Sequence, residues 1–149
     1  MKYKKIILLA VLITLTYSCK TLEINEQISD YERIYPIYKK YEGTPYRYGG
    51  TDARGFDCSG FVGAVYKESF GITLPRSTEL LWNYGKRVNM PMVGDLVFFS
   101  PSDSYNHVGI YVGNDEFIHS SSSKGVMKSR VHDRYYWSKY FVMYRRITK

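Results

Sequence analysis

The sequence is short of cysteine, of long hydrophobic runs and of charge blocks, and each absence narrows what the chain can be. Only two of its 149 residues are cysteines, Cys19 and Cys58, and they lack the short paired spacing usual in structural zinc sites. After the first 18 residues, no apolar run is long enough to cross a bilayer. The net charge is +7, but Lys and Arg form no basic block or basic helix, so we expect no nucleic-acid partner. No internal repeat or separate binding module is visible.

The composition is that of one ordinary globular domain with many aromatic rings. Hydrophobic residues make up 44% and charged residues 23% of the chain. A chain of 149 residues has room for a single domain with a real core. Sixteen tyrosines raise the aromatic share to 17%. Tyrosine suits clefts that bind sugars or peptides, although most of these rings are expected in the core and at its rim.

The first 18 residues are typical of an export signal. Three lysines at positions 2, 4 and 5 form a basic start, and residues 6–15 form an apolar run broken only by Thr14. The run has the length of a signal-peptide core and is too short for a mature transmembrane helix. Removal of residues 1–18 would leave a charge of about +4, a modest excess that fits an anionic envelope surface or polymer.

Cys19 follows the apolar run in the manner of a bacterial lipobox, where the cysteine is acylated and becomes the mature N-terminus. The match is imperfect, because Leu15 lies four residues before Cys19 rather than three and Tyr17 is bulky. Cleavage by ordinary signal peptidase, or an uncleaved anchor, is the alternative. We expect lipidation at Cys19, which would anchor the protein in a membrane of the bacterial envelope, with residues 19–30 as lipidated N-terminus and polar tether. Cys58 would then have no disulfide partner, and a single free cysteine in an exported protein indicates reactive chemistry.

The order of the expected elements predicts one α+β domain over residues 31–149. Helical spacing of apolar side chains predicts helices first, and Pro36 disturbs the first of them. Compact or alternating apolar segments then predict antiparallel strands. The expected helices cover residues 31–41, 58–70 and 77–84, and the expected strands cover residues 94–99, 107–112, 116–120, 126–131 and 140–147.

Cys58 stands at the expected start of the second helix. Asp57 has the side chain of an N-cap residue, and Gly71 ends the helix after Phe70. The first helical turn lies at the positive end of the helix dipole, which favours a thiolate. The alternative is a buried structural cysteine, a common role for free Cys.

Two histidines have the same parity on neighbouring strands of an expected hairpin. A three-residue loop at 113–115 would pair Val112 with Glu116 and place His119 opposite Gly109, so that His107 and His119 share a face. A two-residue loop would place the two histidines on opposite faces. Each histidine taken alone is more often a packed or surface residue.

Cysteine, histidine and a third polar group are the set that nucleophilic attack on an amide requires. The histidine takes the thiol proton and later gives it to the leaving amine, while the third group holds the ring in the right tautomer. Cys58, His107 and His119 fill those roles in that order. The same three residue types are also a permissible ligand set for a catalytic zinc ion, which is the alternative interpretation.

These residues lie in motifs that, in combination, resemble the NlpC-type cell-wall cysteine peptidases, a family with a papain-like fold. The resemblance covers residues 35–147. Its motifs lie at residues 43–46, 49–50, 57–61, 74–77, 94–99, 107–111 and 117–119.

By this resemblance, Cys58 matches the nucleophile, His107 the base and His119 the residue that orients the base. Tyr46 matches a tyrosine beside the nucleophile, whose hydroxyl helps to hold the oxyanion. Residues 79–82 lack the glutamine often found there, so no role is assigned to them. The positions that match the substrate cleft or its rim, each with capping or turn formation as the structural alternative, are Asp57, Ser59, Arg76 and Ser77.

The resemblance implies a thiol protease that hydrolyses peptidoglycan stem peptides. We expect it to act as a monomer and to need no metal or other cofactor. In many members the bond joins γ-D-glutamyl to a diamino acid. The chemistry of the residues alone reaches only acyl transfer by a cysteine nucleophile on a peptide-like substrate. A non-catalytic wall-binding lipoprotein and an amidase or acyltransferase on the same fold are the alternatives.

Overall fold

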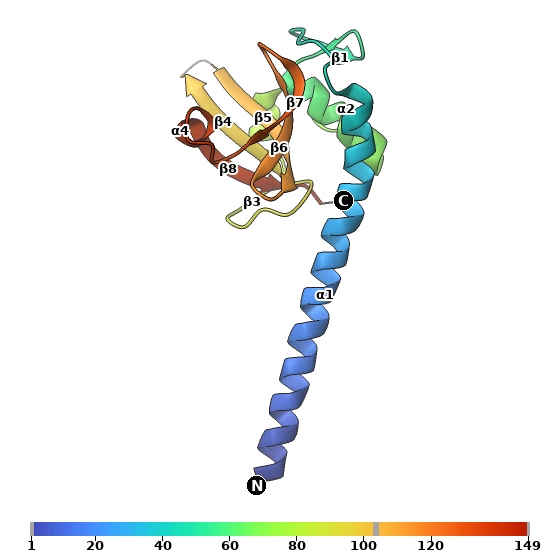
Figure 1. Cartoon of the computed structure of the whole chain (residues 1–149), viewed down its shortest axis with the longest axis vertical. Coiled ribbons are helices and arrows are strands. Elements are labelled where there is room, and N and C mark those ends of the chain that lie inside the picture. Colours follow the sequence, from blue (N-terminus) through green and yellow to red (C-terminus); the bar gives the residue numbers. More distant parts are fainter. Residues whose placement is uncertain (1, 103–104, 149) are drawn as a thin grey trace.

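The protein consists of a long N-terminal helix and an α+β domain packed against the end of that helix (Figure 1). The computed structural model describes residues 2–102 and 105–148. Helix α1 spans Lys2–Tyr41, and its first part extends away from the domain. Ile34, Tyr38 and Tyr41 are buried, so the last turns of α1 belong to the domain core.

Helix α1 includes the segment expected to form a tether. Residues 19–30 are helical, and Cys19 is exposed on the helix surface. The helix also continues through Pro36, where one backbone hydrogen bond is lost while the neighbouring apolar side chains stay packed. The side chains of residues 1–10 and 12–15 of the expected signal peptide lie outside the described residues. Within the described part of the chain, no helix combines the length and apolar character needed to cross a membrane.

The domain alternates short helices with an antiparallel sheet. A small hairpin, β1 (Thr51–Asp52) and β2 (Gly55–Phe56), precedes helix α2 (Cys58–Phe70) and helix α3 (Thr78–Trp82). The remaining elements are β3 (Lys86–Val88), β4 (Leu96–Ser102), β5 (Tyr105–Gly113), β6 (Glu116–Ser121), β7 (Gly125–Arg130), α4 (Trp137–Tyr140) and β8 (Phe141–Arg146).

The larger sheet has six antiparallel strands in the order β3-β8-β4-β5-β6-β7. The α+β prediction is confirmed, and all the expected helices and strands are present. Their ends are shifted by a few residues, except that α1 begins at Lys2 rather than near residue 31. The short elements β1, β2, β3 and α4 were not expected, because two to four residues are too few to show a periodic pattern.

Both faces of the central strand β4 are buried. Leu96 and Phe98 face the main core, which α1 and α2 cover. Val97 and Phe99 face a second aromatic cluster, to which α4 contributes Trp137. Burial on both faces explains why β4 appears in the sequence as a continuous apolar run rather than an alternating one.

The hairpin of β5 and β6 has a different turn from the one expected. Its turn has two residues, Asn114 and Asp115, with φ values of 52° and 63°, and Gly113 pairs with Glu116. The prediction of a three-residue loop at 113–115 is therefore wrong. The register shifts between Tyr111 and Gly113, however, and this bulge restores the pairing parity that the longer loop would have given.

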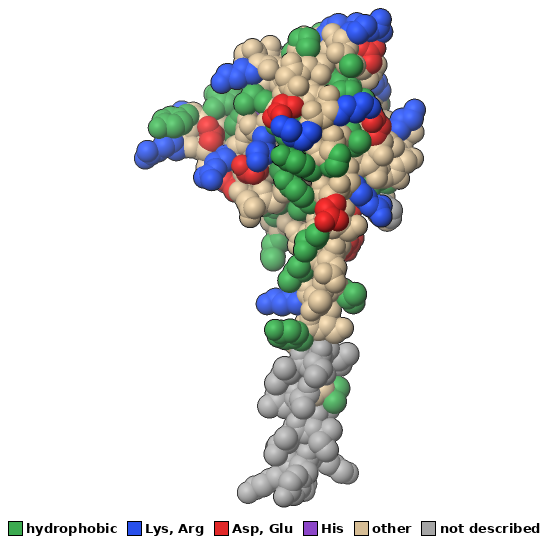
Figure 2. All heavy atoms as spheres, turned by 45° about the vertical axis from the view of Figure 1, so that its right-hand side comes forward, with side chains coloured by type: hydrophobic (Ala, Val, Ile, Leu, Met, Phe, Trp, Pro, Cys, Tyr) green, Lys and Arg blue, Asp and Glu red, His purple; other side chains and the backbone are tan. Residues whose placement is uncertain are grey.

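The surface carries no single block of charge on the face that Figure 2 displays. Lys and Arg side chains are spread over that face among Asp and Glu side chains. Apolar side chains are exposed along α1, including Leu22, Ile24 and Ile28.

Candidate active site

Helix α2 begins at Cys58 because Asp57 caps it. Asp57 has an extended backbone, and its Oδ1 accepts a 2.7 Å hydrogen bond from the Gly60 N–H, one of the first-turn donors that lack a helical partner. Gly71 ends the helix in the left-handed conformation with φ 72°. The predicted cap, start and end of this helix are all confirmed.

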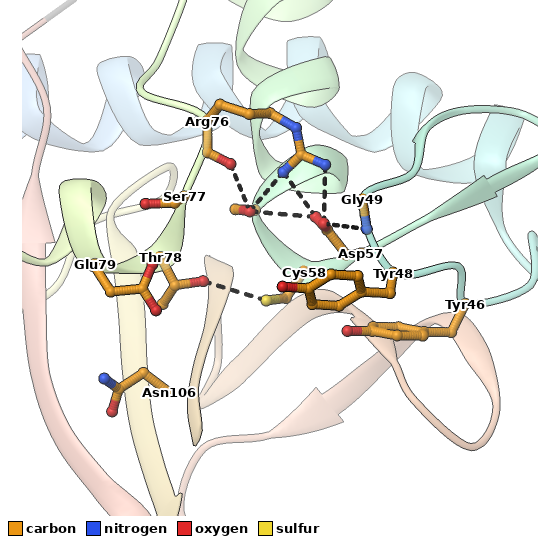
Figure 3. Close-up of a pocket in the computed structure, with 11 residues that line it drawn as sticks. Tyr46, Tyr48, Gly49, Asp57, Cys58, Arg76, Ser77, Thr78, Glu79 and Asn106 are labelled. Carbon is orange, nitrogen blue, oxygen red and sulfur yellow. Dashed lines mark hydrogen bonds and ion pairs between the residues drawn. The ribbon is translucent and has the colours of Figure 1, made fainter. Parts of the chain in front are cut away.

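The thiol of Cys58 is buried and lines a cavity of about 430 Å³ (Figure 3). Its Sγ lies 3.3 Å from Oγ1 of Thr78, which comes from the first turn of α3. A backbone hydrogen bond from Val108 also reaches the thiol, so Cys58 lies against β5 one residue from His107. The other cavity-lining residues are Tyr46, Tyr48, Gly49, Asp57, Ser59, Arg76, Ser77, Glu79 and Asn106.

Burial raises the pKa of the Cys58 thiol above its ordinary value. The hydrogen bonds from Thr78 and Val108 lower it, but by less than burial raises it. The expectation that the helix start would favour a thiolate is therefore wrong in its net effect, because the loss of solvation outweighs the hydrogen bonds that lower the thiol pKa. The resting group is a neutral thiol that needs a base to deprotonate it.

Asp57 and Arg76 form a two-pronged ion pair at the wall of this cavity (Figure 3). Arg76 Nη1 lies 3.0 Å from Oδ1 and Nη2 lies 2.8 Å from Oδ2 of Asp57. Burial would raise the pKa of Asp57, but Arg76 and the Gly60 N–H hold it below its ordinary value. Ser59 joins the network, since its Oγ donates to the Arg76 carbonyl at 2.9 Å.

The four predicted substrate-contacting residues therefore line the cavity while making contacts within the protein. Oδ2 of Asp57 also accepts from the Gly49 N–H, so that with Gly60 and Arg76 both oxygens of the carboxylate are hydrogen-bonded, and the Ser59 hydroxyl lies 3.2 Å from Oδ1. Ser77 caps α3, accepting a 3.3 Å hydrogen bond from Leu80. Capping and scaffolding, the structural alternatives, are observed, and substrate contact by these residues stays a prediction.

Tyr46 lies on the other side of the thiol. It forms an isolated β-bridge with Phe56, directly before the α2 cap, and this bridge brings its ring toward Cys58 (Figure 3). Burial, with smaller contributions from the charges of Cys58 and Asp57, raises the pKa of the Tyr46 hydroxyl. The group is therefore a neutral hydrogen-bond donor beside the nucleophile.

The two histidines meet beside the second aromatic cluster, where Phe99 and Trp137 contact His107 and Phe117 contacts His119. Nε2 of His107 lies 2.9 Å from Nδ1 of His119, and both residues are buried. Burial lowers the pKa of His107 to about 3 and holds that of His119 well below its ordinary value. Both rings are neutral at rest, and the predicted common face is confirmed by this contact.

Trp137 covers the histidine pair. Its ring stacks on His107 with centroids 5.0 Å apart and meets His119 edge-to-face at the same separation. An imidazolium that forms on His107 during a reaction would lie over this indole face, an arrangement that stabilises a cation. Trp137 thus shields His107 from water, which lowers its pKa, while the indole face partly offsets this by its attraction for a cation.

The site has two halves that meet at β5. Cys58 lines the first cavity, whereas His107 and His119 line a second one of about 380 Å³. The two histidine nitrogens face each other rather than a common centre, which disfavours the zinc alternative. Among the described residues, no group of three His, Cys, Asp or Glu side chains is placed to hold a metal ion.

Three residues of the site were missed from the sequence: Thr78, Ser129 and Trp137. Thr78 directly follows the 74–77 motif, so its nearness to the cavity could have been noticed. Ser129 and Trp137 are brought to the histidines by strand pairing and by the packing of α4, and no local pattern marks them.

A comparison with protein families matches residues 43–146 to the NlpC/P60 family. The chain is 47% identical over 113 residues to an Escherichia coli protein named "Probable endopeptidase NlpC", covering 73% of each chain. It is 43% identical over 117 residues to the E. coli "Murein DD-endopeptidase MepS/Murein LD-carboxypeptidase", covering 77% of this chain and 62% of that protein. The chain spans 73% of the length of the first of these two relatives, 62% of the second and 60% of a Haemophilus influenzae protein named "Probable endopeptidase NlpC homolog".

A similar solved structure is that of a Staphylococcus aureus protein described as similar to a lipoprotein of the NLP/P60 family. The TM-score is 0.71 at 32% identity, and the match covers 80% of this chain and 42% of the other.

Proposed function

The chain belongs to the NlpC/P60 family, and we propose that it is a cysteine peptidase that hydrolyses amide bonds in peptidoglycan stem peptides. Its papain-like α+β fold brings the start of a helix against a strand that carries a histidine. The observation that carries the proposal is the hydrogen bond from the Val108 backbone to the Cys58 thiol, since Val108 directly follows His107 in β5 and His107 is hydrogen-bonded to His119.

The first chemical step is attack of Cys58 on the scissile carbonyl. His107 takes the thiol proton, and the sulfur forms a bond to the carbonyl carbon as the carbonyl π electrons move to oxygen. Because Nε2 of His107 is directed at His119, Nδ1 is the ring nitrogen that takes this proton. The imidazolium formed in this step then serves as the acid that protonates the leaving amine.

The tetrahedral oxyanion is held by hydrogen-bond donors around Cys58. The backbone N–H at the start of α2 and the neutral Tyr46 hydroxyl are the donors on this side of the cavity. Collapse breaks the C–N bond, and the amine leaves with the proton from His107. Water, deprotonated by the same imidazole, then hydrolyses the thioester and restores the thiol.

We infer that the bond joins γ-D-glutamyl to a diamino acid, as in many members of the family that the sequence resembles. A second candidate is the D,D crosslink or the terminal L,D bond. It is favoured by the 43% identity to a murein DD-endopeptidase and LD-carboxypeptidase. Both candidates use the same cysteine chemistry and differ only in which carbonyl is presented to Cys58.

Digestion of purified peptidoglycan, with products identified by mass spectrometry, tests both the activity and the bond. Cleavage after γ-D-glutamate releases disaccharide dipeptides, whereas D,D cleavage converts crosslinked dimers into monomers. We expect Cys58→Ala to abolish either product and a chelator to have no effect. Equal hydrolysis by Cys58→Ala would refute the proposal.

The same experiment separates the alternative functions. Binding of stem peptides by the wild type without turnover would indicate a wall-binding lipoprotein. Products in which the acyl group is carried to an amine or lipid, rather than to water, would indicate an acyltransferase, and release of the whole stem peptide would indicate an amidase.

We further propose that the protein acts as a monomer in the bacterial envelope, anchored through acyl chains on Cys19. The exposure of Cys19 on α1, at the end of the basic and apolar signal pattern, supports this location. Metabolic labelling with an alkyne fatty acid is expected to mark the wild type and Cys58→Ala but not Cys19→Ala. Labelling that persists in Cys19→Ala would contradict the anchor, and multi-angle light scattering of the detergent-solubilised protein tests the monomer.

A further inference from the structure

A chain of hydrogen bonds continues from the histidine pair to a serine on the next strand. Nε2 of His119 lies 2.9 Å from Oγ of Ser129. Strand β7 pairs with β6 so that Met127 is opposite His119 and Ser129 is opposite Phe117. Ser129 is therefore diagonal to His119 on the same sheet face, at a separation that side chains can bridge.

These linked hydrogen bonds must all run in one direction, because a neutral imidazole has one N–H donor and one acceptor nitrogen. In one direction Nε2–H of His107 donates to His119, and Nε2–H of His119 donates to Ser129. In the reverse direction Ser129 donates to His119, Nδ1–H of His119 donates to His107, and the remaining proton of His107 sits on Nδ1. Only the first direction leaves Nδ1 of His107 able to accept the thiol proton.

We propose that Ser129 is a positioning residue that accepts a hydrogen bond from His119 and thereby holds His107 in its basic tautomer. The inference deepens the proposed peptidase function and rests on it. Both histidines are buried, so a protonated Nε2 of His119 without an acceptor would be a buried unpaired donor. Removal of the Ser129 hydroxyl would therefore favour the reverse direction of the hydrogen bonds, in which Nε2 of His119 carries no proton.

Among the neighbours of the His119 ring, the Ser129 hydroxyl is the group that can accept a hydrogen bond from Nε2–H. Phe117 stacks on the ring with centroids 4.6 Å apart, and Trp137 meets it edge-to-face. Neither ring offers a lone pair to an imidazole N–H. Ser129 is half-buried at the rim, where its own O–H can still reach another partner or water while the oxygen accepts from His119.

The kinetic test compares three substitutions in the full chain. Ser129→Ala is expected to lower kcat about fivefold to tenfold, the effect of one lost neutral hydrogen bond, with KM unchanged. Ser129→Thr keeps the hydroxyl and is expected to restore most of kcat. Ser69→Ala is the control and is expected to leave kcat unchanged, because the Ser69 hydroxyl donates to the Arg33 carbonyl and lines neither cavity of the site.

A spectroscopic test reads the tautomer without relying on hydrolysis. The chain has three histidines, so long-range 1H–15N spectra of 15N-histidine-labelled protein resolve His107, His119 and the exposed His132 as an internal reference. We expect Nε2–H on both His107 and His119 in the wild type, and a shift of His107 toward Nδ1–H in Ser129→Ala.

The two readouts separate failure of this inference from failure of the proposed function. Nδ1–H on His107 in the wild type, or unchanged tautomers and kcat in Ser129→Ala, would overturn the role of Ser129. Absence of hydrolysis by the wild type, with the expected tautomers in place, would instead count against the peptidase function alone.

Discussion

Nε2 of His107 contacts Nδ1 of His119 at 2.9 Å across a hairpin whose turn has only two residues. A regular ladder closed by that turn would place the two rings on opposite faces of the sheet, because side chains alternate along a strand. The bulge between Tyr111 and Gly113 adds the residue that returns them to one face. The base and its orienting partner thus depend on a local irregularity of the sheet.

The turn at Asn114 is the first place to test that dependence. Asn114 has a φ of 52°, a left-handed conformation that asparagine and glycine tolerate and β-branched residues do not. We expect Asn114→Val to lower the free energy of unfolding by about 1–2 kcal/mol and Asn114→Gly to change it by a few tenths at most. Urea unfolding followed by circular dichroism measures both, and equal stability of the two variants would contradict the strained turn.

Gly109 allows β6 to lie close to β5 beside the histidine pair. A Cβ atom at this position would lie 2.6 Å from Cδ2 of Phe117, 2.8 Å from the Ile118 carbonyl oxygen and 3.2 Å from Cβ of His119. We expect Gly109→Ala to displace His119 and to lower kcat about 100-fold, the usual cost of misplacing a catalytic group by about 1 Å.

Gly63 provides the matched control for this substitution. It lies inside α2, and an added Cβ would meet no atom within 4 Å. Gly63→Ala is expected to raise the free energy of unfolding by about 0.5–1 kcal/mol, because alanine loses less backbone entropy in a helix. Activity should stay at the wild-type level, and a loss equal to that of Gly109→Ala would contradict the specific role of Gly109.

The sequence predicted the parts of the site that depend on local hydrogen bonds. Asp57 caps α2, Gly71 ends it and Ser77 caps α3, because each uses only neighbours within a few residues. The cap at Asp57 also placed Cys58 correctly in the first turn of α2. The loss of solvation at that turn depends on how the whole domain packs around it, which is why the predicted thiolate was wrong.

The unpredicted parts depend on tertiary contacts. The bulge in β5 shifts the register by one residue and leaves no composition signal beyond glycine at 113. Trp137 lies in a four-residue helix and reaches His107 only because α4 packs across the sheet. The predicted common face of the histidines was right although the predicted loop was wrong. The turn is one residue shorter than expected, and the unexpected bulge in β5 adds one residue, so the two errors cancel.

The Asp57–Arg76 pair should stabilise the fold in a pH-dependent way. Arg76→Met is expected to lower the free energy of unfolding at pH 7 by about 1–2 kcal/mol, after allowance for the half-exposed guanidinium. The pKa of Asp57 is depressed, so this contribution is present above the unfolded pKa of about 4 and is lost as pH falls through the lower folded value.

Arg54→Met is the control for Arg76→Met. Arg54 pairs with Asp52 in an equally short contact, but both side chains are exposed, so we expect its unfolding free energy to match the wild type. Denaturant unfolding from pH 3 to 7 should show the stability gap between Arg76→Met and wild type closing at low pH. A constant gap would mean that Arg76 acts by packing alone.

The resting state of Cys58 can be read from its rate of alkylation. In a Cys19→Ser background, Cys58 is the sole thiol, and iodoacetamide reacts with the thiolate. Burial raises the thiol pKa, so we expect slow alkylation at pH 7 and a rate that rises only at a higher pH than that of a free cysteine measured alongside. His107→Ala should leave the profile unchanged, because neutral His107 provides no cation to stabilise the thiolate.

Thr78→Val sharpens the same measurement. Oγ1 of Thr78 lies 3.3 Å from the thiol, and its hydrogen bond lowers the thiol pKa. Removing the hydroxyl at nearly constant volume should therefore move the alkylation profile to still higher pH, whereas Ser77→Ala, which loses only the α3 cap, should not. A wild-type profile that rises near pH 6 and collapses in His107→Ala would instead establish a thiolate–imidazolium pair. The base would then act before substrate binds, rather than during attack on the carbonyl.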